Sequence, residues 1–497
     1  MAGKRLKELF KVDMYMLPAK ICFFLTVGID GTFKPYMVPF LVGVGLNKAE
    51  AGLVMGLRLL GMTFAGPLWG FITDKRQNHV FIVILMTIMS LVLVGGQPLL
   101  SLVIGDKSTN TCPAPVVIET KVNVTNSGIS PTNQSDSSID FRSTRFLVLL
   151  FINIFASAFD GCLISMMDAG VVKRILKSSK KKNFGRNRMF GAFGFSVGSI
   201  LSGSLSDVFP YTDKVNCFAG AFVVLSLYLI GLAIASPFLF RESTEENEAA
   251  EPSELETFKE SKSNTIEKVP EVDLDETPLK EIVFQTLKKF EMILFLLTVF
   301  VLGTLQGIYI GFTALRMEEL DGSTTLVGIT FGVVAFCTSL FMFLAAKLIK
   351  LLRGPWNALC LACLSYVVRF LSFAFISNPW FSIPIHILET LGFGLGLVTQ
   401  VLYIKRNTDP RIHTTMLSIM NTTFFGVGFI AANIVGGQVF SRYGGQATFK
   451  YFGLLATAWS IVLLVVIFIK LCNQQKDKNT NLTTKKNNDE TEMPTQA

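Results

Sequence analysis

The stretch that organises the whole chain runs from residue 241 to residue 289, with the sequence RESTEENEAAEPSELETFKESKSNTIEKVPEVDLDETPLKEIVFQTLKK. It holds 14 acidic and 7 basic residues and is rich in Glu, Ser, Thr and Pro. This composition is typical of a disordered linker, because it offers too little apolar surface to form a core. We therefore predict an acidic, disordered, cytosolic linker over residues 239–291 that divides the chain into two halves.

Long apolar runs lie on both sides of this linker, six before it and six after it. Of the 497 residues, 50% are hydrophobic and only 16% are charged, and the mean hydropathy is +0.49, which excludes a water-soluble fold. About 20 apolar residues span a bilayer as a helix, so each run is a candidate transmembrane helix. The predicted spans cover residues 15–41, 52–72, 80–104, 146–171, 189–209, 217–238, 292–315, 326–349, 356–376, 380–404, 415–440 and 449–471.

We predict an all-α membrane protein in which twelve transmembrane helices form two six-helix, pseudo-symmetric bundles, over residues 15–238 and 292–471. Lys and Arg gather in alternate connections, such as residues 173–188, and such connections remain inside the cell. Both ends, residues 1–14 and 472–497, are therefore predicted to be cytosolic, and the polar C-terminal tail is predicted to be disordered. The protein is predicted to lie in the plasma membrane or in an endolysosomal membrane. The net charge of +8 has the same explanation, so nucleic acid is not a predicted partner.

The connection over residues 105–145 is predicted to face the outside. It is polar and carries two sequons, Asn-Val-Thr at Asn123 and Asn-Gln-Ser at Asn133, which accept N-linked glycans on outward-facing loops. We predict glycosylation at both asparagines. This loop and the linker over residues 239–291 are also the regions through which protein partners would bind.

Ionisable side chains in the apolar spans are costly, so each one singled out below is a candidate functional residue. Asp30 and Lys34 in the first span are four residues apart and lie on one helical face. One interpretation is a near-neutral structural pair, and the other is a cavity-facing pair that contacts a solute. Arg58 in the second span needs an acid on another helix, for which Asp160 is one option.

The sequence HILE at residues 386–389 is the most specific chemical feature. Its spacing places the His386 imidazole and the Glu389 carboxylate on one helical face, close enough to share a proton or to bind one solute. A buried carboxyl whose cationic contact changes with conformation can take up and release a proton. Arg369 in the ninth span could supply that cation. The alternative for His386 is a hydrogen-bonded structural role.

Asp168 near the end of the fourth span and Arg188 at the start of the fifth form another candidate pair. The short connection between these spans makes their helices antiparallel neighbours, so the two side chains can meet. In a cavity, Arg would bind hydroxyls or a carboxylate in a bidentate manner. The alternative is a salt bridge that closes the hairpin at the membrane surface.

The sequence contains no motif of metal-ligand spacing, nucleophile elbow or nucleotide-binding loop. No enzyme activity, cofactor, catalytic residue or metal site is therefore predicted. Glycines recur in the fifth span, at residues 191, 194, 198 and 203, and in the eleventh, at residues 426, 428, 436 and 437. We interpret these glycines as seams at which transmembrane helices pack closely.

Residues 70–76, GFITDKR, resemble the cytosolic loop motif of the major facilitator superfamily. By this resemblance Gly70 permits close packing, and Asp74 with Lys75 and Arg76 forms a cytosolic latch. The Gly that usually follows Arg76 is absent here.

Residues 184–191, FGRNRMFG, resemble the start of the fifth helix in the lactose-permease-like branch of that superfamily. Arg369 with the sequence HILE resembles the proton-coupling set of the same branch. Among animal proteins, the pattern is most similar to the major facilitator superfamily domain-containing protein 6 group. The resemblance covers the twelve spans and implies two six-helix bundles with a solute site between them.

The resemblance also implies roles for a substrate-binding set. Asp168 and Arg188 would hold a sugar-like solute, and Phe195 stands where the sugar permease has a Trp that stacks on the sugar ring. Asp30 and Lys34, which would also contact the solute, have no counterpart in that branch.

We therefore predict a proton-coupled symporter in which Glu389 carries the proton and His386 and Arg369 support it. Its partners would be a small polar solute, protons and the lipid bilayer. The alternative is a cell-surface receptor or interaction protein on a transporter scaffold. It would bind partners through residues 105–145 outside the cell and through the linker inside.

Overall fold

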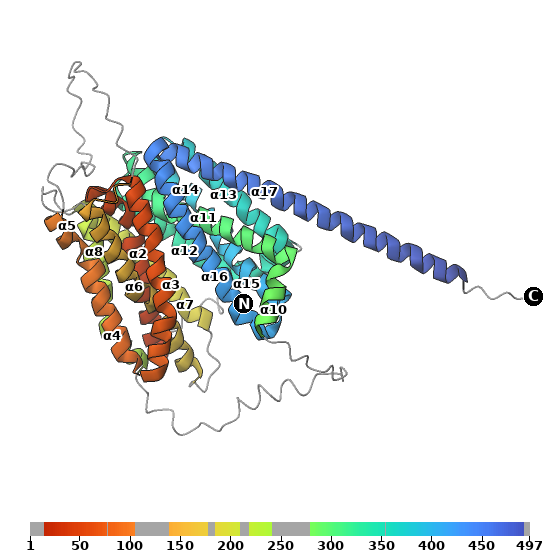
Figure 1. Cartoon of the computed structure of the whole chain (residues 1–497), viewed down its shortest axis with the longest axis horizontal. Coiled ribbons are helices and arrows are strands. Elements are labelled where there is room, and N and C mark those ends of the chain that lie inside the picture. Colours follow the sequence, from red (N-terminus) through yellow and green to blue (C-terminus); the bar gives the residue numbers. More distant parts are fainter. Residues whose placement is uncertain are drawn as a thin grey trace, which may run out of the picture.

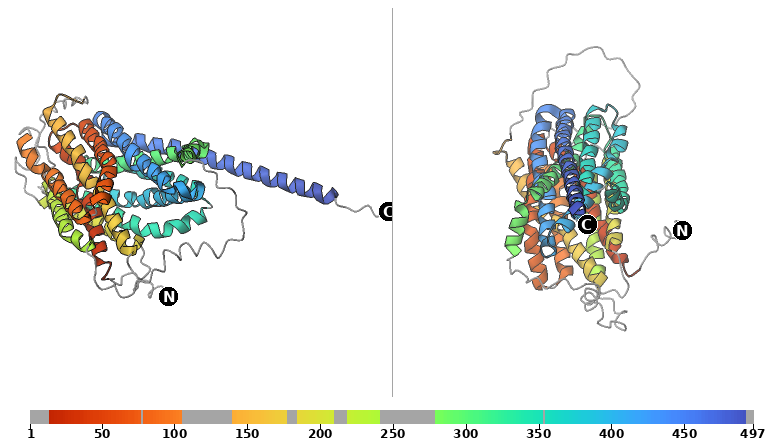
Figure 2. Two further views of the ribbon diagram at one scale, coloured as in Figure 1. Left: turned by 60° about the horizontal axis from the view of Figure 1, so that its bottom comes forward. Right: turned by 90° about the vertical axis from the view of Figure 1, so that its right-hand side faces the viewer.

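Every regular element that the computed structural model describes is a helix (Figure 1), as the sequence predicts. The described residues are 14–76, 78–104, 139–176, 184–208, 218–240, 279–352 and 354–491. The helices form an N-terminal half, α2 to α8, and a C-terminal half, α10 to α17. Figure 2 shows the two halves side by side, with the end of the last helix projecting beyond them.

The N-terminal half consists of long apolar helices. They are α2 (Leu17–Gly43), α3 (Lys48–Arg76), α4 (His79–Ser90), α5 (Gln97–Ile104), α6 (Thr144–Leu176), α7 (Phe184–Val208) and α8 (Ala219–Phe240). A π-helical turn over Leu91–Gly95 lies between α4 and α5, so these two helices continue one apolar stretch.

The C-terminal half has the same all-helical character, with more local distortions. Its helices are α10 (Leu279–Lys288), α11 (Phe290–Glu318), α12 (Thr324–Leu351), α13 (Pro355–Phe375), α14 (Ser382–His386), α15 (Gly396–Asn407), α16 (His413–Asn421) and α17 (Phe429–Thr491). Two π-helical turns, Thr390–Leu395 and Thr422–Gly428, follow α14 and α16. Such turns are frequent at functional sites.

Ten stretches of the described residues are long and apolar enough to cross a membrane. One of them, Pro410–Cys472, includes Gly444, whose backbone is non-helical, so two successive helices meet there. In addition, α2 is not among the ten, and it carries Lys20, Asp30 and Lys34. The all-helical membrane fold is confirmed, whereas the number of twelve spans stays a prediction.

Two segments that were predicted to lack structure contain helix. Helix α10 occupies residues 279–288 of the predicted linker, and its Ile282, Val283 and Leu287 pack against the core. The acidic composition of the linker as a whole hides this short amphipathic pattern. The remainder of the linker, residues 241–278, lies outside the described residues.

The predicted polar tail over residues 472–497 is the second such segment, since α17 continues to Thr491. No Gly or Pro follows Gly453 until Pro494. Because Gly and Pro are the residues that interrupt helices most strongly, the polar composition of the tail alone does not end α17.

The two halves approach each other at the end of the molecule where α3 and α12 begin. A Cβ atom at Gly52 of α3 would meet the backbone of Asn433 and Gly437 in α17. A Cβ atom at Gly203 of α7 would meet the backbone of Thr324 in α12. The close packing agrees with the predicted glycine seams.

Polar contacts join the halves at this same end, which we call the closed end. The Asp207 carboxylate accepts hydrogen bonds from the backbone N–H groups of Thr324 (3.1 Å) and Thr325 (2.7 Å) and from the Thr324 hydroxyl. Lys48 Nζ lies 3.6 Å from Glu319 Oε1. Asp207 and Lys48 belong to the N-terminal half, and their partners belong to the C-terminal half.

Burial along α2 increases toward the closed end. Every residue from 35 to 41, near the closed end, is buried, whereas the side chains of Asp30 and Lys34 are 34% and 40% exposed. Helix α2 contacts α3, α6, α7 and α8 of its own half and α11 and α12 of the other half. The partly exposed charges of α2 therefore lie on the side of these buried residues that faces away from the closed end.

Candidate functional site

The buried charge of the C-terminal half centres on Arg369 in α13. Its side chain is fully buried and forms an ion pair with Glu389, which is 3% exposed and directly precedes the π-helical turn Thr390–Leu395. Pairing of this kind offsets the cost of removing both charges from water. The structure thus brings together two of the three residues predicted for proton coupling.

Three aromatic rings surround the guanidinium of Arg369. Its Cζ lies 4.2 Å from the ring centroid of Tyr309, 4.8 Å from that of Tyr366 and 5.2 Å from that of Phe370. Cation–π contacts are strongest when the cation has lost its water, as it has here. The Tyr366 hydroxyl also donates to Gln306 Oε1 (2.6 Å), which ties α13 to α11.

His386 lies in the same buried region and also packs against Tyr309. Its ring centroid is 5.0 Å from that of Tyr309 and 4.5 Å from that of Phe373. Neither ring nitrogen has a hydrogen-bond partner among the described residues. Tyr309 therefore contacts both His386 and Arg369, and the imidazole does not hydrogen-bond to Glu389. We call Arg369, His386 and Glu389 the C-half cluster.

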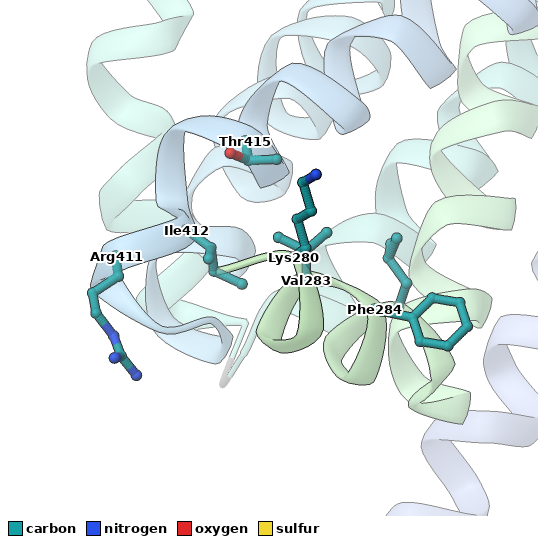
Figure 3. A pocket seen from close by; sticks show the side chains of 7 residues that line it. Lys280, Val283, Phe284, Arg411, Ile412 and Thr415 are labelled. Atoms are coloured by element: carbon teal, nitrogen blue, oxygen red, sulfur yellow. The ribbon is translucent and has the colours of Figure 1, made fainter. Parts of the chain in front are cut away.

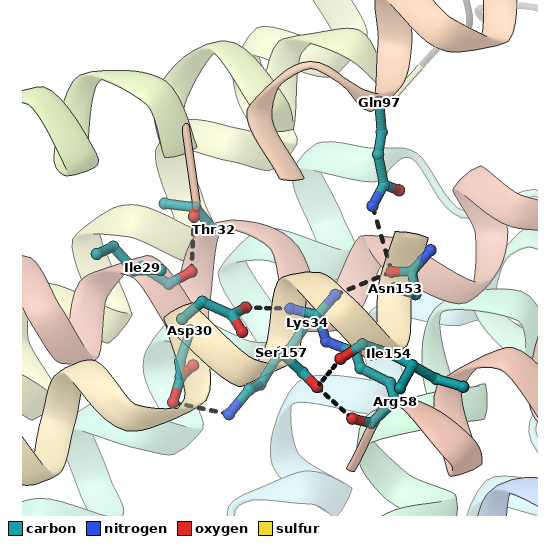
Figure 4. Close-up of polar contacts among 10 residues, drawn as sticks. Ile29, Asp30, Thr32, Lys34, Arg58, Gln97, Asn153, Ile154 and Ser157 are labelled. Atoms are coloured by element: carbon teal, nitrogen blue, oxygen red, sulfur yellow. Dashed lines mark hydrogen bonds and ion pairs between the residues drawn. The ribbon is translucent and has the colours of Figure 1, made fainter. Parts of the chain in front are cut away.

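Arg58 anchors a second buried group of polar residues, in the N-terminal half (Figure 4). It forms an ion pair with Asp160 of α6, which was one option from the sequence, and its Nη1 donates to Asn153 Oδ1 (2.9 Å). Gln97 Nε2 donates to the same Asn153 oxygen (3.2 Å). The Ser157 hydroxyl donates to the backbone carbonyl of Arg58. Three residues of α6 thus bind Arg58.

Asp30 and Lys34 form an ion pair beside this group, as Figure 4 shows, with 2.7 Å between Asp30 Oδ2 and Lys34 Nζ. Both lie close enough to Asp160 for their charges to act on its carboxylate. Unlike Arg58 and Asp160, whose side chains are each 6% exposed, this pair is partly accessible. We call Asp30, Lys34, Arg58 and Asp160 the N-half cluster.

Asp168 and Arg188 also meet, with 3.4 Å between Arg188 Nη1 and Asp168 Oδ2. Their side chains are 27% and 49% exposed, respectively. Both interpretations of this pair require the contact, so it does not separate a solute site from a structural salt bridge. Phe195 lies one to two turns further along α7, where it is partly buried against the core.

The predicted cytosolic latch lies at the end of α3. A Cβ atom at Gly70 would meet nothing within 4 Å, so Gly70 does not pack closely in this conformation. The side chain of Lys75 is exposed, and those of Asp74 and Arg76 lie outside the described residues, as do Asn123 and Asn133. The latch and the glycosylation sites stay predictions.

A surface pocket of about 350 Å³ lies between α10 and the start of α16 (Figure 3). It is lined mainly by apolar side chains such as Val283 and Ile412. Arg411, at its rim, pairs with Asp409 (2.8 Å), and these hydrogen bonds hold the pKa of Asp409 below its usual value. We assign no ligand to this pocket. Among the described residues, no group of three or more His, Cys, Asp or Glu could hold a metal ion.

The fold and the buried charges together define a multi-pass integral membrane protein of the transporter class. A family model described as the MFS_1 like family matches residues 16–451. The chain belongs to this family, within the major facilitator superfamily, as the sequence predicts. Its relatives are membrane transporters, so the prediction that the chain is not an enzyme is confirmed.

Curated relatives agree with this assignment. Maltose permease of Geobacillus stearothermophilus is 24% identical over 65% of this chain and 72% of its own length. Major facilitator superfamily domain-containing protein 6-like protein B of Xenopus laevis is 22% identical over 71% of this chain and 54% of its own length. The chain therefore matches about half of the Xenopus relative.

Solved structures show the same fold. A crystal structure of the nucleoside transporter NupG has a TM-score of 0.64 at 14% identity, over 92% of this chain and 99% of that one. A bacterial homolog of the human lysosomal transporter Spinster, in an inward-facing and unoccupied conformation, has a TM-score of 0.57 at 13% identity, over 92% and 96% of the two chains.

Proposed function

We propose that this protein is a proton-coupled symporter that moves a small polar solute by alternating access. In transporters of this architecture the solute site lies between the two halves near the middle of the membrane. Asp168, Arg188, Phe195, Asp30 and Lys34 would contact the solute. The four charged residues are partly exposed in helices of the N-terminal half, which supports this assignment.

The observation that carries the proposal is the buried C-half cluster. Arg369 and Glu389 neutralise each other where almost no water reaches them, and His386 is buried beside them. When a change of conformation separates the carboxylate from Arg369, protonation is the remaining way to neutralise it. A proton carried inward contributes about 2.3 kcal/mol per 100 mV of membrane potential.

The orientation proposed from the sequence makes the closed end the outer end, with both termini in the cytosol. The structure would then represent an inward-facing state of the transport cycle. Gly70, Asp74, Lys75 and Arg76 would form a latch only when the cytosolic side closes. The open space beside Gly70 is consistent with this order of events.

Replacing Glu389 by glutamine should separate transport from proton coupling. The amide mimics a protonated carboxyl and can still accept a hydrogen bond from Arg369, whose charge also faces the rings of Tyr309 and Tyr366, so exchange of solute across reconstituted vesicles should continue within a few-fold of the original rate. Uphill uptake driven by a pH gradient should be abolished. The measurement is uptake of labelled sugars, nucleosides and organic anions, with and without an imposed gradient.

The matched control is Glu291→Gln, since Glu291 is an exposed acid paired with Lys470 (3.0 Å) at the start of α11. This variant should keep both exchange and uphill uptake. Intact uphill uptake in the Glu389→Gln variant would defeat the assignment of Glu389 as the proton carrier.

A further inference from the structure

Asp30 and Lys34 are the partly exposed charged side chains of α2 that lie nearest to the closed end. Residues 35–41, which follow them toward the closed end, are all buried. Helices of both halves surround α2. A partly exposed charge pair in the middle of such a helix faces a water-filled space rather than lipid, because charges in contact with hydrocarbon are costly. A solute that enters from the open end would therefore meet this pair.

The N-half cluster contains two cations and two anions, and they are arranged as two separate pairs. Arg58 and Asp160 are buried, and Arg58 also hydrogen-bonds to Asn153, so a solute cannot replace either partner. Asp30 and Lys34 hold each other only through an i, i+4 contact between partly exposed side chains. Such pairs contribute little to stability, so this one can open toward a solute.

The charge balance determines which solute can replace the contact between Asp30 and Lys34. A solute with a single charge would bind one of these side chains and leave the other without its partner, and a neutral solute would satisfy neither charge. A solute that carries an ammonium and a carboxylate close together would bind both at once. Two ion pairs would then form where one existed, and no charge would remain unpaired.

We propose that the transported solute is a zwitterion of amino-acid size, whose ammonium group binds Asp30 and whose carboxylate binds Lys34. This inference rests on the proposed transport function and names the chemical class of its solute. The buried pair of Arg58 and Asp160 is neutral overall, so it adds no net charge to the surroundings of Asp30 and Lys34.

The first test uses the unaltered full-length protein in reconstituted vesicles. Labelled amino acids, betaine and short peptides are compared with maltose, sucrose, nucleosides, monocarboxylates and monoamines. We expect uptake of at least one zwitterion. Its N-acetyl derivative, which lacks the ammonium charge, and its methyl ester, which lacks the carboxylate, should each compete about tenfold or more weakly, because each loses one charge pair.

The second test changes the two side chains one at a time. Asp30→Asn leaves Lys34 as a lone cation, so uptake of the zwitterion should fall about tenfold or more while a carboxylate without an ammonium group becomes a better competitor. Lys34→Gln should shift the preference toward amines without a carboxylate. Lys470→Gln, which breaks the ion pair with Glu291 elsewhere in the chain, should leave the preference unchanged.

The outcomes distinguish this inference from the proposed function. If the protein takes up only a neutral sugar or nucleoside, with a pH gradient as the driving force and at the same rate in both variants, the solute is not a zwitterion. The proposed proton-coupled symport would remain supported. Uptake of a zwitterion that needs both charges but ignores the pH gradient would support the inference and overturn the coupling. If the derivatives that lack one charge compete with the unaltered protein as well as the zwitterion does, the inference fails even where the variants do not fold.

Discussion

Replacing Arg369 by methionine is expected to destabilise the protein by about 3–5 kcal/mol, because it leaves the Glu389 carboxylate buried without its cation. Methionine fills much of the space between the rings of Tyr309 and Tyr366 but carries no charge for their faces to attract. The measurement is the thermal unfolding of the purified protein in detergent, and the variant should unfold at a clearly lower temperature.

Combining Arg369→Met with Glu389→Gln should restore a large part of this loss, since the double variant no longer contains a buried, unpaired charge. The matched control is Arg411→Met, which removes an arginine from an exposed pair with Asp409 and should leave the unfolding temperature nearly unchanged. A double variant that is no more stable than Arg369→Met alone would show that the carboxylate is not the source of the instability.

The overall fold follows from hydropathy because a bilayer imposes a nearly fixed length on each apolar helix. The predicted span over residues 356–376 agrees closely with α13, Pro355–Phe375. The predicted span over residues 292–315 lies within α11, Phe290–Glu318. The ends of the apolar stretches were harder to predict, since α10 and the last part of α17 are helices outside them.

The charged residues of the site could also be predicted from the sequence, because charge stands out in an apolar span. A formal charge is rare within an apolar span and costs energy unless it is paired, so Arg369 and Glu389 stand out and are expected to meet. Tyr309 and Gln306 were missed because uncharged polar residues do not stand out in the same way. Their hydroxyl and amide groups within a span are a weaker signal that could have marked them.

The polar contacts between the two halves could not be predicted. Asp207 and Thr324 lie near the ends of their spans, where polar residues are common and need no special partner. Helical periodicity tells which residues share a face but not how a helix of one half lies against a helix of the other. The carboxylate of Asp207 meets the first turn of α12 only because the halves come together at the closed end.

Replacing Gly52 by valine should prevent the closed end from forming. A Cβ atom at this position would lie 2.9 Å from the Cα of Gly437 and closer still to the carbonyl oxygen of Asn433, and backbone cannot move aside as a flexible side chain does. Overpacking of this kind costs about 1–3 kcal/mol, which shifts the ratio of closed to open conformations by roughly 5- to 150-fold. The rate of solute transport should fall as the closed conformation becomes less populated.

The populations can be followed by a crosslink that a short bifunctional thiol reagent forms between cysteines placed at Lys48 and Glu319, whose side-chain ends meet across the two halves at the closed end. Its yield should drop when Gly52→Val is added. Gly66→Val is the matched control on the same helix, because a Cβ atom at Gly66 would meet nothing within 4 Å. Equal crosslinking and equal transport in the two valine variants would mean that the approach of α3 to α17 does not limit closure. A loss confined to Gly52→Val would instead identify this contact as one that the transport cycle must make and break.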